Sequence, residues 1–141
     1  MPRSEPSPVL LLRSPDLTDR VAYASAVDTR SRLVFTAGAC PLDADGNTVA
    51  PGDFVAQARR TLQNLDLALR DSGAVVADVL KTTVYVASSS RADLVAVWQE
   101  VAAYFGEHDA PSTLLGVSVL GYPDQLVEVE VEAVAATPPS A

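Results

Sequence analysis

Hydrophobic and polar residues alternate along several segments of the chain, and this two-residue period predicts β-strands. The clearest case is 126–135 (LVEVEVEAVA), whose valines point to one face while its glutamates point to the other. Segment 80–86 (LKTTVYV) also alternates, with Leu80, Thr82, Val84 and Val86 on one face and Lys81, Thr83 and Tyr85 on the other. Less regular runs of apolar and β-branched residues predict four more strands, at 9–13, 21–27, 32–37 and 113–120.

A period of 3.6 residues replaces this alternation in two places and predicts helices. The first helix begins after Asp53, a good N-cap, and ends at Gly73; its apolar stripe is Phe54, Ala58, Leu62, Leu65 and Leu69. The second begins after the polar turn 88–90 and ends at Gly106, and its stripe is Leu94, Val97, Trp98, Val101, Tyr104 and Phe105.

The predicted order β-β-β-α-β-α-β-β favours an α+β domain. Hairpins join consecutive strands, and parallel pairing is expected across each helix, so the sheet is mixed and both helices cover one face. The other face then needs a cover, for which a second copy of the protein is the simplest source. The predicted single domain spans 9–136, between Pro/Ser-rich flexible ends at 1–8 and 137–141.

Composition and net charge disfavour several classes of binding partner. The formal net charge of −8 disfavours nucleic acid and anionic membranes, and no apolar run approaches a membrane span. The single cysteine, Cys40, excludes an internal disulfide, and with no signal-peptide pattern at the N-terminus this favours a cytoplasmic protein. One histidine, His108, and one cysteine offer no zinc site.

Five segments in series resemble the Rid (YjgF/RidA) family in order and spacing, over nearly the whole domain. They are FTAGACPLDADGN (35–47), QARRTLQNLDLALRDSGA (57–74), DVLKTTVYV (78–86), VWQEVAAYF (97–105) and LVEVEVEAVA (126–135). The resemblance implies a chorismate-mutase-like fold and a homotrimer with a small-molecule pocket between subunits. It also implies hydrolysis of reactive imines or enamines to ketones and ammonia, without metal or cofactor.

The resemblance assigns roles to individual residues of this chain. Glu130 matches the glutamate that positions water or moves protons, and Tyr23 matches an early tyrosine that shapes the pocket. Gly38 matches the glycine after the third strand, and Ala37 stands where the family has a serine.

The family's substrate-binding arginine is missing. It belongs to a Pro-Ala-Arg-Ser/Thr motif, whereas this chain continues from Pro111 with STLLGV, so that Ser112 or Thr113 takes its place and Leu115 follows in the same segment. A neutral hydroxyl does not replace a guanidinium that grips a carboxylate. We therefore expect a less anionic ligand, bound by Tyr23, Ala37, Gly38, Ser112, Thr113 and Leu115.

Simpler interpretations stand beside these roles. The glutamates of the last strand fit a solvated face, Ser112 and Thr113 fit ordinary strand residues, and Trp98 fits the core or a subunit interface. Cys40 fits a small buried hydrophobe better than a nucleophile.

Three functions remain. The first is a cofactor-free hydrolase or deaminase-like enzyme that uses Glu130, and the second is a trimer that binds a metabolite without turnover. The third, a ribonuclease, is disfavoured because the chain is acidic and offers no basic face.

Overall fold

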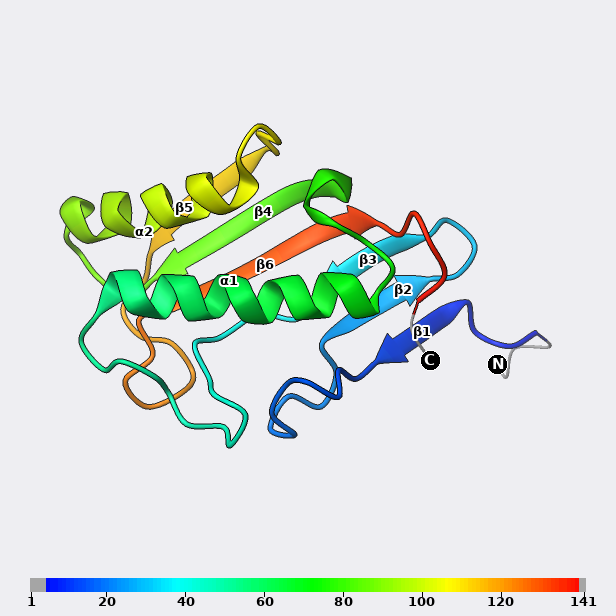
Figure 1. Cartoon of the computed structure of the whole chain (residues 1–141), viewed down its shortest axis with the longest axis horizontal. Coiled ribbons are helices and arrows are strands. Elements are labelled where there is room, and N and C mark those ends of the chain that lie inside the picture. Colours follow the sequence, from blue (N-terminus) through cyan, green and yellow to red (C-terminus); the bar gives the residue numbers. More distant parts are fainter. Residues whose placement is uncertain (1–4, 140–141) are drawn as a thin grey trace.

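A mixed six-stranded sheet carries two helices on one face, as the pattern predicts (Figure 1). The computed structural model describes residues 5–139, so the outermost parts of both predicted flexible ends, 1–4 and 140–141, lie outside the described residues. The elements are β1 (Val9–Leu12), β2 (Ser25–Asp28), β3 (Leu33–Thr36), α1 (Phe54–Asp71), a 3₁₀ turn (Val76–Asp78), β4 (Val79–Val86), α2 (Arg91–Phe105), β5 (Ser112–Gly116) and β6 (Val127–Val134).

The strand order is β1-β2-β3-β6-β4-β5, so the last strand of the chain lies between β3 and β4. β4 and β5 run parallel across α2, as predicted, whereas every other neighbouring pair is antiparallel. The prediction that the two strands flanking α1 pair in parallel is wrong, because β6 lies between β3 and β4 and pairs with both.

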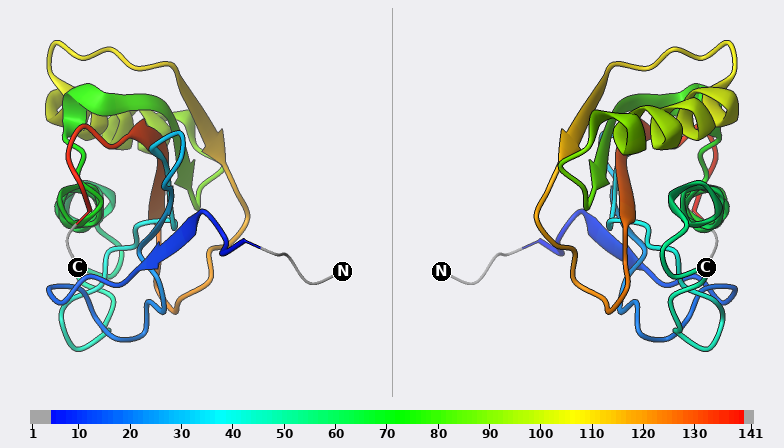
Figure 2. Two further views of the ribbon diagram at one scale, coloured as in Figure 1. Left: turned by 90° about the vertical axis from the view of Figure 1, so that its right-hand side faces the viewer. Right: turned by 90° about the vertical axis from the view of Figure 1, so that its left-hand side faces the viewer.

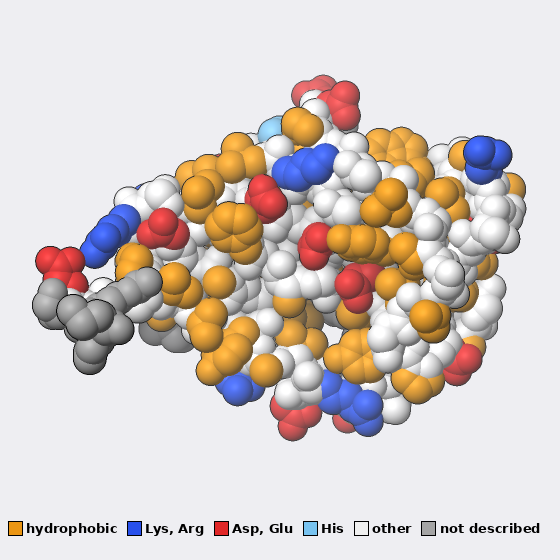
Figure 3. All heavy atoms as spheres, turned by 180° about the vertical axis from the view of Figure 1, so that it is seen from behind, with side chains coloured by type: hydrophobic (Ala, Val, Ile, Leu, Met, Phe, Trp, Pro, Cys, Tyr) orange, Lys and Arg blue, Asp and Glu red, His pale blue; other side chains and the backbone are white. Residues whose placement is uncertain are grey.

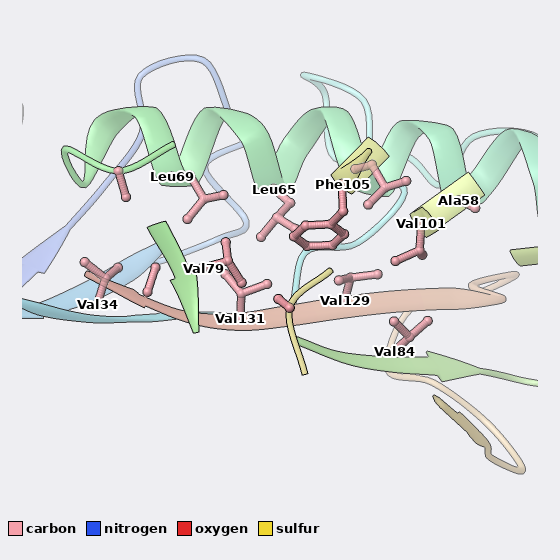
Figure 4. Packing of buried hydrophobic residues seen from close by; sticks show 14 of the residues in the cluster. Val34, Ala58, Leu65, Leu69, Val79, Val84, Val101, Phe105, Val129 and Val131 are labelled. Atoms are coloured by element: carbon pink, nitrogen blue, oxygen red, sulfur yellow. The ribbon is translucent and has the colours of Figure 1, made fainter. Parts of the chain in front are cut away.

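The core lies between the sheet and the helices, which cover the same side in both end views (Figure 2). Apolar residues of β6 and β4 meet the stripes of α1 and α2, where Leu65, Leu69, Val97 and Val101 are almost fully buried (Figure 4). α1 begins as predicted, since the Asp53 carboxylate accepts a hydrogen bond from the Ala56 amide at 3.0 Å. It ends before Gly73, whose φ of 83° explains the glycine.

Three strand details differ from the sequence pattern. Leu80 is exposed and does not share the buried face of Thr82, because an irregularity between Val79 and Lys81 lets Val79 face the core instead. The segment predicted as 113–120 forms a strand only to Gly116, where its partner β4 also ends. Likewise β2 starts at Ser25 rather than at residue 21, opposite the end of β1 at Leu12.

Replacing Leu65 by alanine tests the helix-to-sheet core. Leu65 is fully buried against β6, so Leu65→Ala should lower the free energy of unfolding by about 2–5 kcal/mol in denaturant titration. Val75→Ala is the control, because Val75 is 63% exposed and its loss should change stability by less than about 0.5 kcal/mol. Equal effects of the two substitutions would contradict this description of the core.

Candidate functional site

Polar side chains gather on the face of the sheet that the helices leave open. Alternation on β4 and β6 brings them into register, with Lys81 opposite Glu132, Thr83 opposite Glu130 and Tyr85 opposite Glu128. On the outer side of β4, Thr113 and Leu115 of β5 lie beside Thr83 and Tyr85. Figure 3, turned by 180° from Figure 1, looks directly onto this face, where several acidic side chains lie among hydrophobic ones.

Glu130 lies at the centre of this face and is held from β4. The Tyr85 hydroxyl donates a hydrogen bond of 2.6 Å to its Oε1. This bond to the Glu130 carboxylate is the main cause that raises the pKa of Tyr85 to about 12, with burial and the negative charge adding to it. Tyr85 therefore stays a neutral donor around neutral pH and fixes the carboxylate of Glu130.

Lys81 is the cation of the group. Its Nζ donates a hydrogen bond of 2.7 Å to Thr113 Oγ1, which links β4 to β5 one register step from Glu130. Lys81 also stands opposite Glu132 in the register of the β4–β6 ladder. A hollow beside these groups is lined by Phe35, Thr36, Lys81, Thr83, Glu130, Val131 and Glu132.

A β-bulge opens the sheet next to Glu130. Phe35 faces Glu132 and Ala39 faces Val129, so three residues on one strand, 36–38, span the same stretch as two on the other. The Thr36 hydroxyl fills the resulting gap: the Val131 amide donates to it at 2.9 Å, and it donates to the Val131 carbonyl at 3.3 Å. Bulges re-aim side chains beside functional sites, and this one interrupts the ladder opposite Glu130.

Gly38 lies in this bulge and leaves room for Glu128. A Cβ on Gly38 would overlap the carboxylate of Glu128, which lies directly over the backbone there. Gly38 does not have a positive φ, so the need for glycine is steric rather than conformational. The Glu128 Oε1 accepts hydrogen bonds from Gln125 Nε2 at 3.1 Å and from the Cys40 thiol at 3.2 Å.

A second, mainly apolar cavity lies on the helix side of the same bulge, lined by Leu17, Thr18, Val21, Ala24, Ala37, Gly38, Ala39, Cys40, Leu42, Asn64 and Ala68. The thiol of Cys40 borders this cavity. Burial, followed by the nearby charge of Glu128, raises the pKa of Cys40 far above its usual range, so the thiolate needed for nucleophilic attack is suppressed. The simpler interpretation of Cys40, a small buried residue, is the better one.

The described residues, 5–139, contain no cluster of three or more histidine, cysteine, aspartate or glutamate side chains suited to a metal ion. Over the same residues, no helix has the length and apolar character needed to span a membrane.

Comparison with known proteins identifies the family. A family model described as Endoribonuclease L-PSP matches residues 15–136, which is most of the chain. The chain belongs to this family, the Rid (YjgF/RidA) proteins.

Individual relatives support the assignment. A RutC family protein of Haemophilus influenzae is 36% identical over 115 residues, 80% of this chain and 85% of that protein. A Salmonella typhimurium protein named 2-iminobutanoate/2-iminopropanoate deaminase is 34% identical over 113 residues, again 80% and 85%. The crystal structure of the YjgF gene product from Escherichia coli superposes with a TM-score of 0.74 at 27% identity, covering 89% of this chain and 98% of that one.

The residues assigned from the Rid resemblance fall into separate groups in the monomer. Glu130, Thr113 and Leu115 share the open face, and Ala37 and Gly38 lie at the bulge beside it. Ser112 pairs with Thr82 and so faces the helix side, where its hydroxyl donates to the Ala110 carbonyl at 2.9 Å. Of the two candidates for the arginine's place, only Thr113 therefore presents its side chain to the open face.

Tyr23 lies apart from Glu130 in the monomer. Its ring packs under the Arg13 guanidinium, 4.9 Å from the ring centre, and lines a wide hollow formed mainly by β1 and the segment after it, residues 10–21. The two remaining residues named in the sequence analysis lie elsewhere, and for Trp98 the simpler interpretation, a core residue, agrees with the structure. Trp98 packs against the core, and the His108 ring bonds through Nε2 to the Val79 carbonyl at 2.8 Å.

Lys81 and Tyr85 complete the candidate site of this Rid protein, although neither residue is assigned a role by the sequence pattern or the resemblance. A signal for them was present: the alternation in 80–86 already placed both on the same face of one strand. What the sequence lacked was the neighbour, because only the pairing of β4 with β6 brings this face beside the glutamates.

The Tyr85–Glu130 bond predicts a pH dependence. A raised pKa means that the folded state favours the neutral phenol, so this contribution to stability is complete below pH 10 and is lost as the pH rises through about 12. Tyrosinate absorbance, compared between wild type and Tyr85→Phe, should show Tyr85 ionising near pH 12. In Glu130→Gln the same group should ionise closer to pH 10, because the carboxylate charge is gone. An unchanged titration in Glu130→Gln would rule out the coupling.

Proposed function

We propose that this Rid protein is a cofactor-free hydrolase that converts a small imine or enamine to a carbonyl compound and ammonia. The observation that carries the proposal is the Glu130 carboxylate, fixed by Tyr85 beside a polar hollow. Relatives more than 30% identical are named 2-iminobutanoate/2-iminopropanoate deaminases, which supports imine chemistry for this chain too. The pocket would form between the subunits of a homotrimer.

In this proposal Glu130 acts as the general base and then as the general acid. It takes a proton from water while the water oxygen bonds to the imine carbon and the π pair of the C=N bond moves to nitrogen. It then returns this proton to nitrogen, which gives a carbinolamine. In a second relay Glu130 takes the proton of the carbinolamine hydroxyl and passes it to the amino nitrogen, the C–N bond breaks as C=O forms, and ammonia leaves. Water is the only co-reactant, and an enamine enters the sequence after protonation at carbon.

Tyr85 and Lys81 are positioning residues in this scheme. Tyr85 occupies one oxygen of Glu130, which leaves Oε2 without a hydrogen bond from residues 5–139 and free to contact water. Lys81 holds Thr113, whose methyl and hydroxyl border the same face. Neither group needs to change its protonation state during the reaction.

The open face also supports the trimer. Phe35 and Leu115 are both more than 40% exposed there, and a surface of this kind on a small protein favours association. A second copy seated on this face would exclude water from the hollow and strengthen its electrostatic interactions.

A binding protein without turnover is the second candidate. The observation in its favour is the missing arginine: Ser112 faces the helix side, so β5 offers the open face no group that grips a carboxylate tightly. A ribonuclease fits less well. Although the family model carries an endoribonuclease description, the open face presents three carboxylates where an RNA phosphate would need cations.

Replacing the proposed base tests the catalytic role. Glu130→Gln should reduce imine hydrolysis at least a hundredfold, because general acid–base catalysis contributes about 10²–10⁴ in rate. Ammonia release from imines generated in situ by an amino-acid oxidase or an amine oxidase is the measurement. Glu107→Gln makes the same change of charge at an exposed residue beyond the end of α2 and should leave the rate unchanged.

A rate in Glu130→Gln equal to that of wild type would reject Glu130 as the base. No acceleration by wild type of any imine, together with specific ligand binding, would favour the binding protein instead.

The trimer has its own test. Phe35→Asp buries a charge in the proposed interface and should shift the protein to monomers in sedimentation velocity. Val75→Asp, at a residue that is more exposed and lies on the connection before β4, should remain trimeric. Trimers that persist in Phe35→Asp would move the interface away from this face.

A further inference from the structure

The guanidinium of Arg13 is held in place by an aromatic ring rather than by an acid. Its Cζ lies 4.9 Å from the centre of the Tyr23 ring, within the range of a cation–π contact. The fold fixes this pairing, because the Ala24 amide donates to the Leu12 carbonyl at 2.8 Å and closes the base of the loop 13–23. Arg13 and Tyr23 are the first and last residues of that loop, so they lie next to each other.

The N–H donors of Arg13 have no partner within the described chain. Among residues 5–139, its side chain forms no ion pair and no hydrogen bond. Asp16, the nearest acid in sequence, is bound instead by Arg70. A cation–π contact uses none of the five N–H donors of a guanidinium. Arg13 is therefore a positioned positive charge whose hydrogen-bonding capacity is unused, and such a group binds oxyanions.

Arg13 and Tyr23 border the wide hollow along β1, which is an edge strand of the sheet (Figure 1). The hollow has a volume of about 810 Å³, within the range of roughly 300–1,000 Å³ that small-molecule sites occupy. Its walls are mainly apolar and include Leu10 and Leu11, which are 39% and 50% exposed. As far as residues 5–139 define this lining, Arg13 is its only cation and Asp19 its only acid, and no ion pair joins them.

We infer that this hollow is a binding site for a small carboxylic acid with a short apolar chain, whose carboxylate binds the Arg13 guanidinium. The chain of the ligand lies against Leu10 and Leu11, which removes apolar surface of both partners from water. Tyr23 is a positioning residue, because its ring orders Arg13 and its hydroxyl is not needed. The inference goes beyond the proposed function, since it requires neither Glu130 nor turnover.

A carboxylate matches this site better than a phosphate does. Its planar group accepts two parallel N–H bonds from a guanidinium, and one arginine balances its single charge. A phosphate monoester carries more charge than one arginine balances, and the described lining offers Asp19 rather than a second cation. The missing arginine of the β5 segment predicts a less anionic ligand there, but it does not affect this hollow, which β1 and the loop 13–23 form.

Four probes test the class of ligand: hexanoate, acetate, hexan-1-ol and inorganic phosphate. In an NMR titration of the isotope-labelled chain, hexanoate should shift the amide signals of residues 10–23. It should bind at least tenfold more tightly than acetate, because the apolar walls bury its chain, and than hexan-1-ol, which has no charge. Inorganic phosphate should bind more weakly than hexanoate. The inference is overturned if either acetate, the alcohol or phosphate binds as tightly as hexanoate, or if the shifts are confined to the open face of β4 and β6.

Variants of the charged residues test the contact itself. Arg13→Gln should weaken hexanoate binding at least tenfold, and Arg13→Lys should recover only part of it, because an ammonium lacks the fork of a guanidinium. Asp19→Asn should strengthen binding, since it removes a charge that repels the ligand. Arg91→Gln is the matched control: Arg91 is exposed at the start of α2, and its loss should leave the affinity unchanged. Full affinity in Arg13→Gln would reject the site.

Two substitutions of Tyr23 separate its ring from its hydroxyl. Tyr23→Phe keeps the cation–π contact and should bind hexanoate as wild type does, whereas Tyr23→Leu should bind it several-fold more weakly. Equal loss in both variants would assign the contact to the hydroxyl and reject the positioning role. These measurements involve no turnover, so a failure of the carboxylate site leaves the proposed hydrolase standing, and a failure of hydrolysis leaves the carboxylate site standing.

Discussion

The structure depends on the placement of β6 between β3 and β4. This strand is the last one among the described residues, yet it pairs with both β3 and β4 and so joins the two parts of the sheet. Its small apolar residues, Val127, Val129, Val131 and Ala133, are 0–3% exposed beneath the helices. Because side chains on a strand alternate, burying the valines fixes the glutamates on the opposite face. A slip of one residue in register would bury three carboxylates, so the core and the site specify each other.

The bulge opposite Glu130 is the second constraint. It adds one residue to the β3 side without disturbing the pairing on either end, and Thr36 satisfies the backbone groups that the interruption leaves open. The arrangement leaves the Gly38 backbone uncovered, and the Glu128 side chain lies over it. A single glycine thus connects the geometry of the sheet to the position of a charged side chain more than 80 residues later.

Much of the fold could be predicted from periodicity alone. The stripes of both helices, the alternation of β6 and the caps at Asp53 and Gly73 are local patterns that the structure confirms. The insertion of β6 between β3 and β4 could not be predicted, because strand order is set by contacts between distant segments. Leu80 was assigned to the wrong face because a local irregularity changes the alternation without leaving a mark in the sequence.

The candidate site also contains residues that the sequence predicts and residues that only the fold brings together. Glu130, Thr113 and Gly38 follow from the resemblance together with the alternation, and the structure places them on or beside one face. Tyr85, Lys81 and the support of Glu128 depend on which strands become neighbours, and so they emerge only from the fold. Ser112 shows the limit of matching by order, because its parity on β5 turns it toward the helices.

Three glutamates at alternate positions of one strand repel one another, and this is a cost that the fold must offset. Among the described residues, Tyr85 holds Glu130, Gln125 and Cys40 hold Glu128, and Lys81 stands opposite Glu132 in the strand register. The donors to Glu130 and Glu128 are therefore neutral groups, which fix the position of both carboxylates. Donors of this kind hold the geometry of the acids, which is what the proposed role of Glu130 requires of its surroundings.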